Sequence, residues 1–67
     1  MKRYLVFGWE AWEASGGFGD FLKDFDNFEE AEAFIREYIK GKSWPYGEVI
    51  DITKPVEEAL VFEISTR

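Results

Sequence analysis

One segment of the chain, residues 27 to 41, carries the marks of an α-helix at both ends. Asn27 can cap it, and Glu30, three residues on, completes a capping box in an acidic first turn. Gly41 follows as the expected C′ residue. The sequence therefore predicts a helix over residues 28–40. Its apolar residues recur at helical spacing and form one stripe: Phe28, Ala31, Phe34, Ile35, Tyr38 and Ile39.

Segments rich in aromatic and β-branched residues flank this helix, two before it and two after it. The predicted strands are Arg3–Trp12, Asp20–Phe25, Glu48–Thr53 and Ala59–Ser65. Residues 14–19 connect the first two strands, residues 42–47 lead from the helix to the third with Pro45 and Gly47 as turn residues, and Pro55 interrupts the last pair. We expect a single α+β domain over residues 1–67, a ββαββ fold whose four-stranded antiparallel sheet carries the helix on one face. The expected strand order is 2-1-3-4, with 2-1-4-3 as the alternative.

The first strand is apolar on both sides. Leu5, Phe7 and Trp9 alternate with Tyr4 and Val6, so this strand should be central. A single helix covers one face of a sheet, so the second face needs the 44–46 loop, a second copy of the chain or another partner to cover it. The residues predicted to form this partner or homodimer face are Tyr4, Val6, Val49, Val61, Trp44 and Tyr46.

Negative charge is concentrated between Glu10 and Glu37, which hold nine carboxylates and two basic residues, in a chain of net charge -6. The basic residues are scattered, which disfavours direct binding of nucleic acid. No apolar run approaches the ~20 residues that span a bilayer, and no export signal is visible at the start. We expect a cytoplasmic protein that does not bind membranes. The composition, without Cys or Gln and rich in Glu, Lys and Ile, also resembles that of thermophile proteins.

The residue types argue against catalysis. The chain has no His and no Cys, which removes the commonest nucleophiles, bases and metal ligands. Carboxylate pairs close in sequence, such as Asp24 with Asp26 and Glu57 with Glu58, would need a cleft that shifts one pKa. Residues 20–27 have spaced oxygens but lack the glycine of a calcium-binding loop. We expect no enzyme, no metal and no cofactor, with a small carboxylate-dependent enzyme as an alternative.

The function that this pattern favours is a non-enzymatic module whose acidic face occupies a basic surface of a partner protein. The residues predicted to form that face are Asp24, Asp26, Glu29, Glu30, Glu32 and Glu37. They are mostly unpaired in the sequence pattern, where Glu32 with Arg36 is the one favourable pair on the outer face of the helix. One alternative is a structural or assembly homodimer recognised through its aromatic sheet face. The simplest alternative is that the charges only keep the protein soluble.

Several short stretches also resemble the small acidic ββαββ proteins of phages and prokaryotes. They are Tyr4-Leu5-Val6-Phe7, Gly16-Gly17 with Asp20, Phe25-Asp26 leading into Phe28-Glu29-Glu30-Ala31, and Val49-Ile50-Asp51-Ile52. The long connection around Pro55 departs from the pattern, which has a tight turn there. The resemblance carries over no catalytic residue. It implies a role such as inhibition of a host enzyme or defence complex, including by mimicry of nucleic acid.

Overall fold

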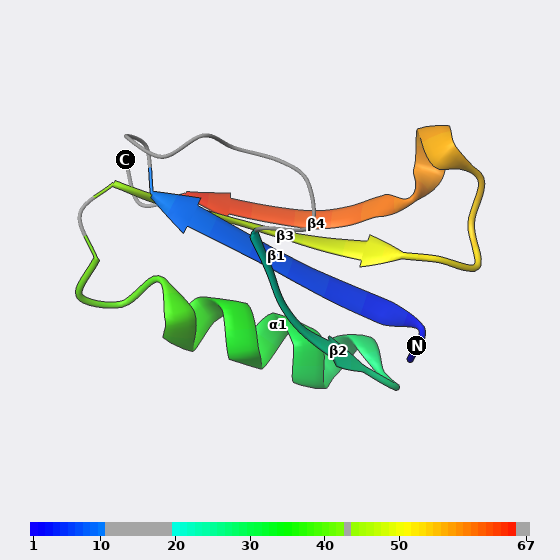
Figure 1. Ribbon diagram of the computed structural model, residues 1–67, viewed down its shortest axis with the longest axis horizontal. Coiled ribbons are helices and arrows are strands. Elements are labelled where there is room, and N and C mark those ends of the chain that lie inside the picture. Colours follow the sequence, from blue (N-terminus) through cyan, green and yellow to red (C-terminus); the bar gives the residue numbers. More distant parts are fainter. Residues whose placement is uncertain (11–19, 43, 66–67) are drawn as a thin grey trace.

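Every segment predicted to be regular forms a helix or a strand, in the predicted order (Figure 1). The computed structural model describes residues 1–10, 20–42 and 44–65. The elements are β1 (Tyr4–Glu10), β2 (Phe21–Phe25), α1 (Phe28–Tyr38), β3 (Pro45–Asp51), the short 3₁₀ turn η2 (Val56–Glu58) and β4 (Leu60–Ser65). The predicted extension of the first strand to Trp12 and the connection at residues 14–19 lie outside the described residues.

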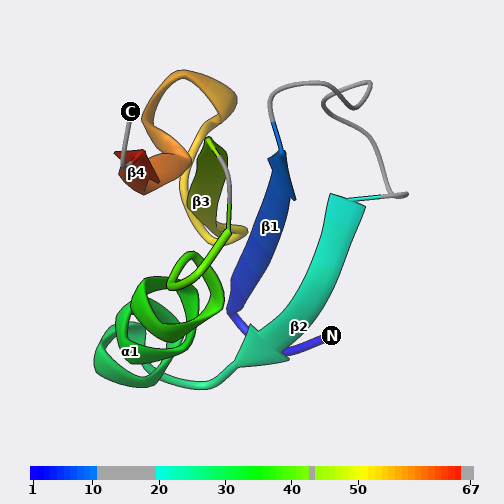
Figure 2. The ribbon, with the colours of Figure 1, turned by 90° about the vertical axis from the view of Figure 1, so that its left-hand side faces the viewer.

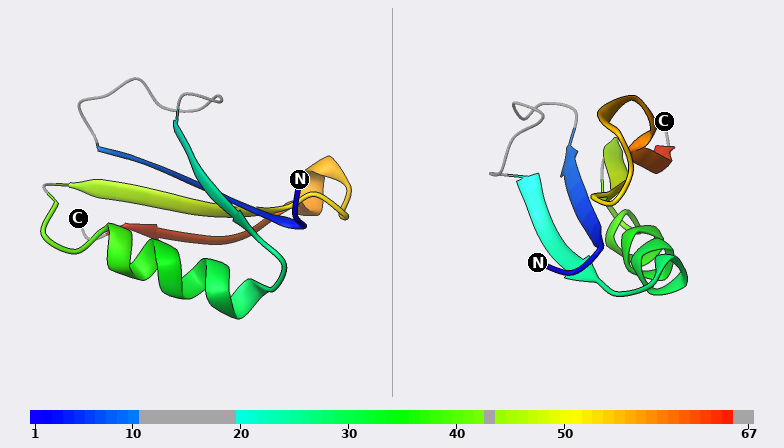
Figure 3. Two further views of the ribbon diagram at one scale, coloured as in Figure 1. Left: turned by 60° about the horizontal axis from the view of Figure 1, so that its bottom comes forward. Right: turned by 90° about the vertical axis from the view of Figure 1, so that its right-hand side faces the viewer.

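The four strands form one antiparallel sheet in the order β2-β1-β3-β4, which confirms the predicted order 2-1-3-4. β1 and β3 are central and pair along their whole length, from Tyr4 opposite Asp51 to Glu10 opposite Pro45. Figure 2, turned by 90° from Figure 1, shows α1 on one side of the sheet. The two views of Figure 3 show that α1 runs lengthwise along this face. The fold is therefore the predicted two-layer α+β arrangement.

The helix begins as predicted and ends two residues early. Asn27 caps it by accepting the backbone N–H of Glu30 at 2.9 Å, and the last helical residue is Tyr38. Gly41 has a φ of 76°, the left-handed conformation that favours glycine after a helix. α1 presents one apolar face to the sheet because its buried residues, Ala31 and Ile35, lie four apart.

The third strand starts earlier than predicted. It begins at Pro45 rather than Glu48, so Pro45 and Gly47 are strand residues and not turn residues. Pro45 is tolerated because it is the first residue of the strand, where a missing N–H interrupts the ladder least. Trp44 just before it has a φ of 59°, so the change of direction between α1 and β3 occurs before Pro45.

The core lies between α1 and the sheet. Val6 and Val49, which are cross-strand partners, are fully buried against Ala31 and Ile35 of the helix. Aromatic rings enlarge this core. They meet in the pairs Phe25–Phe34, Phe28–Phe62 and Tyr4–Phe28, at centroid distances of 5.4, 6.0 and 6.0 Å.

This arrangement corrects the predicted second face of the sheet. Val6 and Val49 were expected on an exposed partner or dimer face, but they form the centre of the core, and Tyr4 and Val61 pack against it. Of the predicted face, Tyr46 lies on the open side of the sheet and Trp44 remains 45% exposed. The alternation of residues along β1 was predicted correctly, but the helix covers the face that was expected to stay open. A homodimer through Tyr4, Val6, Val49 and Val61 is therefore not available to the folded chain.

Two glycines explain which face the helix covers. Gly8 of β1 and Gly47 of β3 are cross-strand partners on the same face as Val6 and Val49. A Cβ on Gly47 would lie 2.3 Å from Cγ1 of Ile35, and one on Gly8 would lie 2.6 Å from a ring carbon of Tyr38. Because neither residue has a side chain, α1 can approach the sheet closely at this pair. The opposite face carries bulky residues at the neighbouring positions and has no such opening.

The glycine pair can be tested by adding one methyl group. We expect Gly47→Ala to lower the free energy of unfolding by about 1–3 kcal/mol, the usual cost of overpacking a core. Urea unfolding followed by circular dichroism measures it. Ile35→Val removes Cδ1, the second nearest atom to the new methyl group. In a double-mutant cycle, the double variant should therefore lose less stability than the sum of the losses in the two single variants. An unchanged unfolding midpoint for Gly47→Ala would contradict the close approach.

Candidate functional site

The carboxylates predicted to bind a partner lie at the end of β2, at the start of α1 and along its outer face. We call them the helix acidic surface, defined by Asp24, Asp26, Glu29, Glu30, Glu32 and Glu37. Asp24 and Glu32 are half-buried and the others are exposed. Asp26, Glu29 and Glu30 lie together around the start of α1, because the chain passes from β2 into α1 within three residues. Glu32 and Glu37 lie farther along the helix. Asp24 does not join them, because it is the cross-strand partner of Leu5, on the face of the sheet opposite α1.

Two of these carboxylates are neutralised on the helix itself. Glu32 pairs with Arg36 at 2.7 Å, one helical turn on, as the spacing predicted. Glu37 also pairs with Lys40, at 3.2 Å, although both side chains are largely exposed. Exposed pairs of this kind add little stability, but they reduce the negative charge that the outer face presents.

A third carboxylate is held by the N-terminal segment. The backbone N–H of Lys2 donates to Oδ2 of Asp24 at 2.9 Å and lowers the pKa of Asp24. The pairing of Glu32 was predicted, whereas the ion pair of Glu37 and the hydrogen bond to Asp24 were not. Among the described residues, the members of the helix acidic surface with neither an ion pair nor such a hydrogen bond are Asp26, Glu29 and Glu30.

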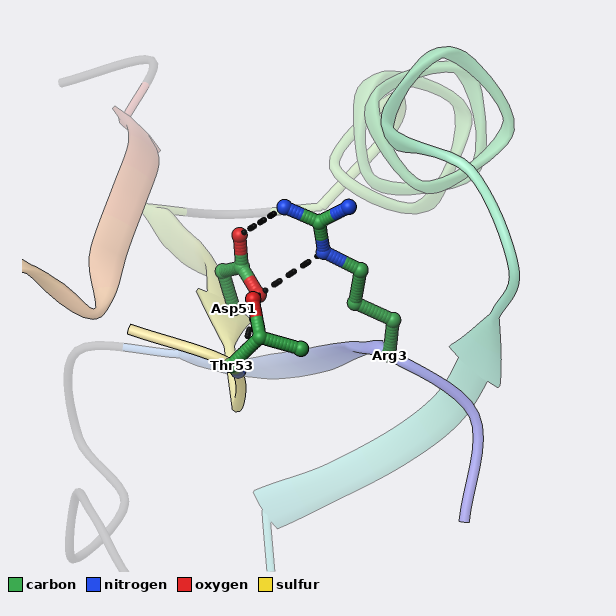
Figure 4. A network of polar contacts seen from close by, with 3 residues as sticks. All are labelled: Arg3, Asp51 and Thr53. Atoms are coloured by element: carbon green, nitrogen blue, oxygen red, sulfur yellow. Dashed lines mark hydrogen bonds and ion pairs between the residues drawn. The ribbon is translucent and has the colours of Figure 1, made fainter. Parts of the chain in front are cut away.

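A buried acid at the end of β3 is fully satisfied inside the fold (Figure 4). Asp51 is 1% exposed, and its two carboxylate oxygens accept hydrogen bonds from Nε and a terminal nitrogen of Arg3 at 3.1 and 2.9 Å. The backbone N–H and hydroxyl of Thr53 donate to it at 3.0 and 2.7 Å. The Arg3 guanidinium holds the pKa of Asp51 well below its usual range. This network is structural, since it ties the start of β1 to the end of β3.

The face of the sheet opposite α1 carries aromatic residues. Trp9 and Tyr46, cross-strand partners on β1 and β3, stack with their ring centroids 5.8 Å apart and their planes 20° apart. Phe7 contacts Phe21 edge to face at 5.7 Å. Beside the stacked pair lies a cavity of about 340 Å³, which we call the aromatic–acidic pocket. Its lining residues are Trp9, Tyr46, Gly47, Glu48, Glu63, Ile64 and Ser65.

Two carboxylates of this pocket lie opposite each other on neighbouring strands. Glu48 of β3 is the cross-strand partner of Glu63 of β4, an arrangement of like charges that destabilises a sheet. Partial burial, and then the charge of Glu63, raise the pKa of Glu48. No basic side chain among the described residues pairs with either carboxylate.

This pair could not be found among the carboxylates that lie close together in the sequence. Glu48 and Glu63 meet through the register of β3 and β4, where a bulge shifts the pairing by one residue. Asp51 was missed as a buried group for a related reason. Its signal is its place in β3, where it alternates in step with Gly47 and Val49 on the helix side.

In the described part of the chain, no three or more acidic residues lie close enough together to hold a metal ion. No helix in residues 1–10, 20–42 and 44–65 is long and apolar enough to cross a membrane.

The low pKa of Asp51 gives a stability that depends on pH. A carboxylate whose pKa is lowered by folding stabilises the native state above its unfolded pKa, and this contribution is lost as acid protonates it. We expect Asp51→Asn to lower the urea midpoint at pH 7, with the deficit shrinking below about pH 4. Asp26→Asn, an exposed acid at the start of α1, is the matched control and should change little. Equal deficits at pH 7 and pH 2 would show that the charge of Asp51 does not matter.

The raised pKa of Glu48 predicts the opposite dependence of stability on pH. A group that binds its proton more tightly in the folded state makes the protein less stable as pH rises through its titration. We expect Glu48→Gln to stabilise the protein at pH 7 by roughly 0.2–1 kcal/mol, the range for cross-strand pairs, because solvent screens this partly exposed site. The gain should vanish below the ordinary glutamate value of 4.5. A loss of stability at pH 7 would mean that Glu48 has a partner inside the fold.

Comparison with known proteins places the chain in a phage family. No curated protein matches it, and no solved structure does. A family model does match, over residues 4–67, a range that includes every strand and the helix. This agrees with the expected resemblance to small phage-type proteins. The chain belongs to the family described as Bacteriophage T4 protein Y07C.

Proposed function

We propose that this chain is a non-enzymatic module that binds a basic surface of a partner protein and blocks or regulates it. The observation that carries the proposal is the cluster of exposed carboxylates around the start of α1. Asp26, Glu29 and Glu30 have no basic partner among the described residues. The chain as a whole has a net charge of -6, which favours encounter with a positively charged surface.

The position of these carboxylates supports their availability. Glu29 and Glu30 lie in the first turn of α1, where the helix dipole stabilises a negative charge by about 0.3–1 kcal/mol. The helix dipole, rather than a basic side chain, therefore stabilises their charge. Their carboxylate oxygens stay open to an external lysine or arginine.

The class of partner that we propose is a protein whose basic groove ordinarily holds nucleic acid. Such a groove is lined by lysine and arginine that contact phosphates. A rigid helix start with spaced carboxylates offers the same sign of charge on a preorganised surface. Membership of a phage family supports a bacterial host protein as the partner.

Charge reversal tests the proposal. The partner is captured with the tagged chain from a host lysate and purified, and its affinity is then measured for Glu29→Lys/Glu30→Lys. We expect at least about a tenfold loss, equivalent to ~1.4 kcal/mol. The matched control is Glu57→Lys/Glu58→Lys in η2, which makes the same change of charge at two exposed carboxylates elsewhere. It should reduce affinity less.

Two outcomes would contradict the acidic-surface model. One is equal loss in both variants, which would reflect net charge alone. The other is affinity that does not change when salt is raised to molar levels. Because lysine near a helix start also weakens the helix, Glu29→Gln/Glu30→Gln is measured beside the reversal, with circular dichroism to verify folding.

A second candidate function is assembly through the open sheet face, which the stacked Trp9 and Tyr46 favour. A homodimer on that face would bring Glu48 and Glu63 of two copies together, which like-charge repulsion opposes. Sedimentation velocity at high micromolar concentration separates the two functions. A monomer agrees with the acidic module, and a tight dimer favours assembly.

An enzymatic role would use the carboxylates of Glu48 and Glu63. A raised pKa beside a cavity is the feature that acid–base catalysis needs. The described lining of the pocket, however, contains no cationic side chain that would stabilise a developing negative charge, and the chain has no histidine. We therefore propose that the pocket binds rather than reacts.

A further inference from the structure

We infer that the aromatic–acidic pocket receives the guanidinium group of an arginine side chain. The arginine belongs to the partner protein, so this inference rests on the proposed function and names a second contact of that complex. The pocket lies on the open face of the sheet, whereas α1, with Glu29 and Glu30, covers the other face. The two contacts can therefore be altered separately.

The aromatic walls favour a flat cation. Trp9 and Tyr46 are stacked on the sheet, which fixes both rings at the edge of the pocket. A guanidinium stacks on such rings and is attracted by their π electrons, and it is more weakly hydrated than an ammonium group. Both rings are half-buried, so part of the cost of ordering them is already met by the fold.

The carboxylates supply the second half of the recognition. Glu48 and Glu63 face each other on neighbouring strands and together offer four oxygens to the five N–H donors of a guanidinium. No basic side chain among the described residues pairs with either carboxylate, so the described lining carries negative charge alone. A cation between them would convert their mutual repulsion into two attractions.

Other ligands fit the pocket less well. A calcium ion takes 6–8 oxygen ligands. The described lining offers two carboxylates among aromatic and apolar groups, and it is not a cluster that could hold a metal ion. A nucleic acid would bring phosphates toward Glu48 and Glu63, and a second copy of the chain would bring two more carboxylates. An organic cation matches both the charge and the walls.

The inference can be tested without the partner. N-acetyl-arginine amide is titrated into ¹⁵N-labelled protein, and the signals of Trp9, Glu48 and Glu63 are followed by NMR. N-acetyl-citrulline amide has nearly the same shape without the charge and serves as the control probe. We expect saturable shifts at these residues with the arginine probe, at a Kd of about 1 mM, and none with citrulline.

Matched variants locate the binding. Glu48→Gln/Glu63→Gln should weaken binding of the arginine probe at least about tenfold while the fold is kept, because glutamine has nearly the same volume. Glu57→Gln/Glu58→Gln removes the same charge from η2 and should leave binding unchanged. Equal binding of N-acetyl-lysine amide would overturn the preference for a guanidinium. Absence of saturable shifts with arginine, or equal shifts with citrulline, would overturn the site.

The same variants separate this inference from the proposed function. If the captured partner binds Glu48→Gln/Glu63→Gln normally and the arginine probe gives no shifts, the pocket is wrong and the acidic module stands. If the arginine probe binds as expected but Glu29→Lys/Glu30→Lys leaves partner affinity unchanged, the helix acidic surface is wrong and the pocket stands.

Discussion

The close approach of α1 to the sheet at Gly8 and Gly47 is the constraint on which the rest of the structure depends. The two glycines are cross-strand partners, so together they clear one continuous area of the central strands. Ile35 and Tyr38 occupy the space where two side chains would otherwise stand. A domain of this size has no disulfide to reinforce it and relies on packing of this kind. The position of the helix then decides what each face of the sheet can carry.

Covering one face leaves a distinctive surface on the other. With Val6 and Val49 beneath α1, alternation places Phe7, Trp9 and Tyr46 on the open side. The same alternation sets Glu48 beside Tyr46, and the pairing of β3 with β4 brings Glu63 opposite. The aromatic–acidic pocket is thus a direct consequence of which side the helix occupies. The helix acidic surface follows from the same geometry, since α1 turns its outer side to solvent.

The capped helix and the four strands could be predicted from the sequence because each depends on local signals. The strand order is not local, so 2-1-3-4 was expected with 2-1-4-3 as the alternative, and the structure has the first. Asn27 with Glu30 marks the helix start, and alternation marks β1. The covered face could not be predicted from hydrophobicity, because both faces of β1 are apolar. The volume of the side chains on each face decides which face the helix covers. Gly8 and Gly47 were the residues in the sequence that indicated it, although Gly47 was interpreted as a turn residue. The pairing of Glu48 with Glu63 depends on a bulge that no residue type marks.

Two carboxylates of β3 show how differently the fold treats its charges. Asp51 is almost fully buried, yet Arg3 and Thr53 give it four hydrogen bonds, so its charge stabilises the native state. Glu48, three residues earlier, meets another acid instead of a base. Stability alone does not favour that arrangement, since glutamine or threonine would suit an open sheet face better. A residue that costs stability in the isolated fold is expected where a ligand compensates for it, and the guanidinium that we propose for this pocket would supply the positive charge that Glu48 and Glu63 share no other way among the described residues.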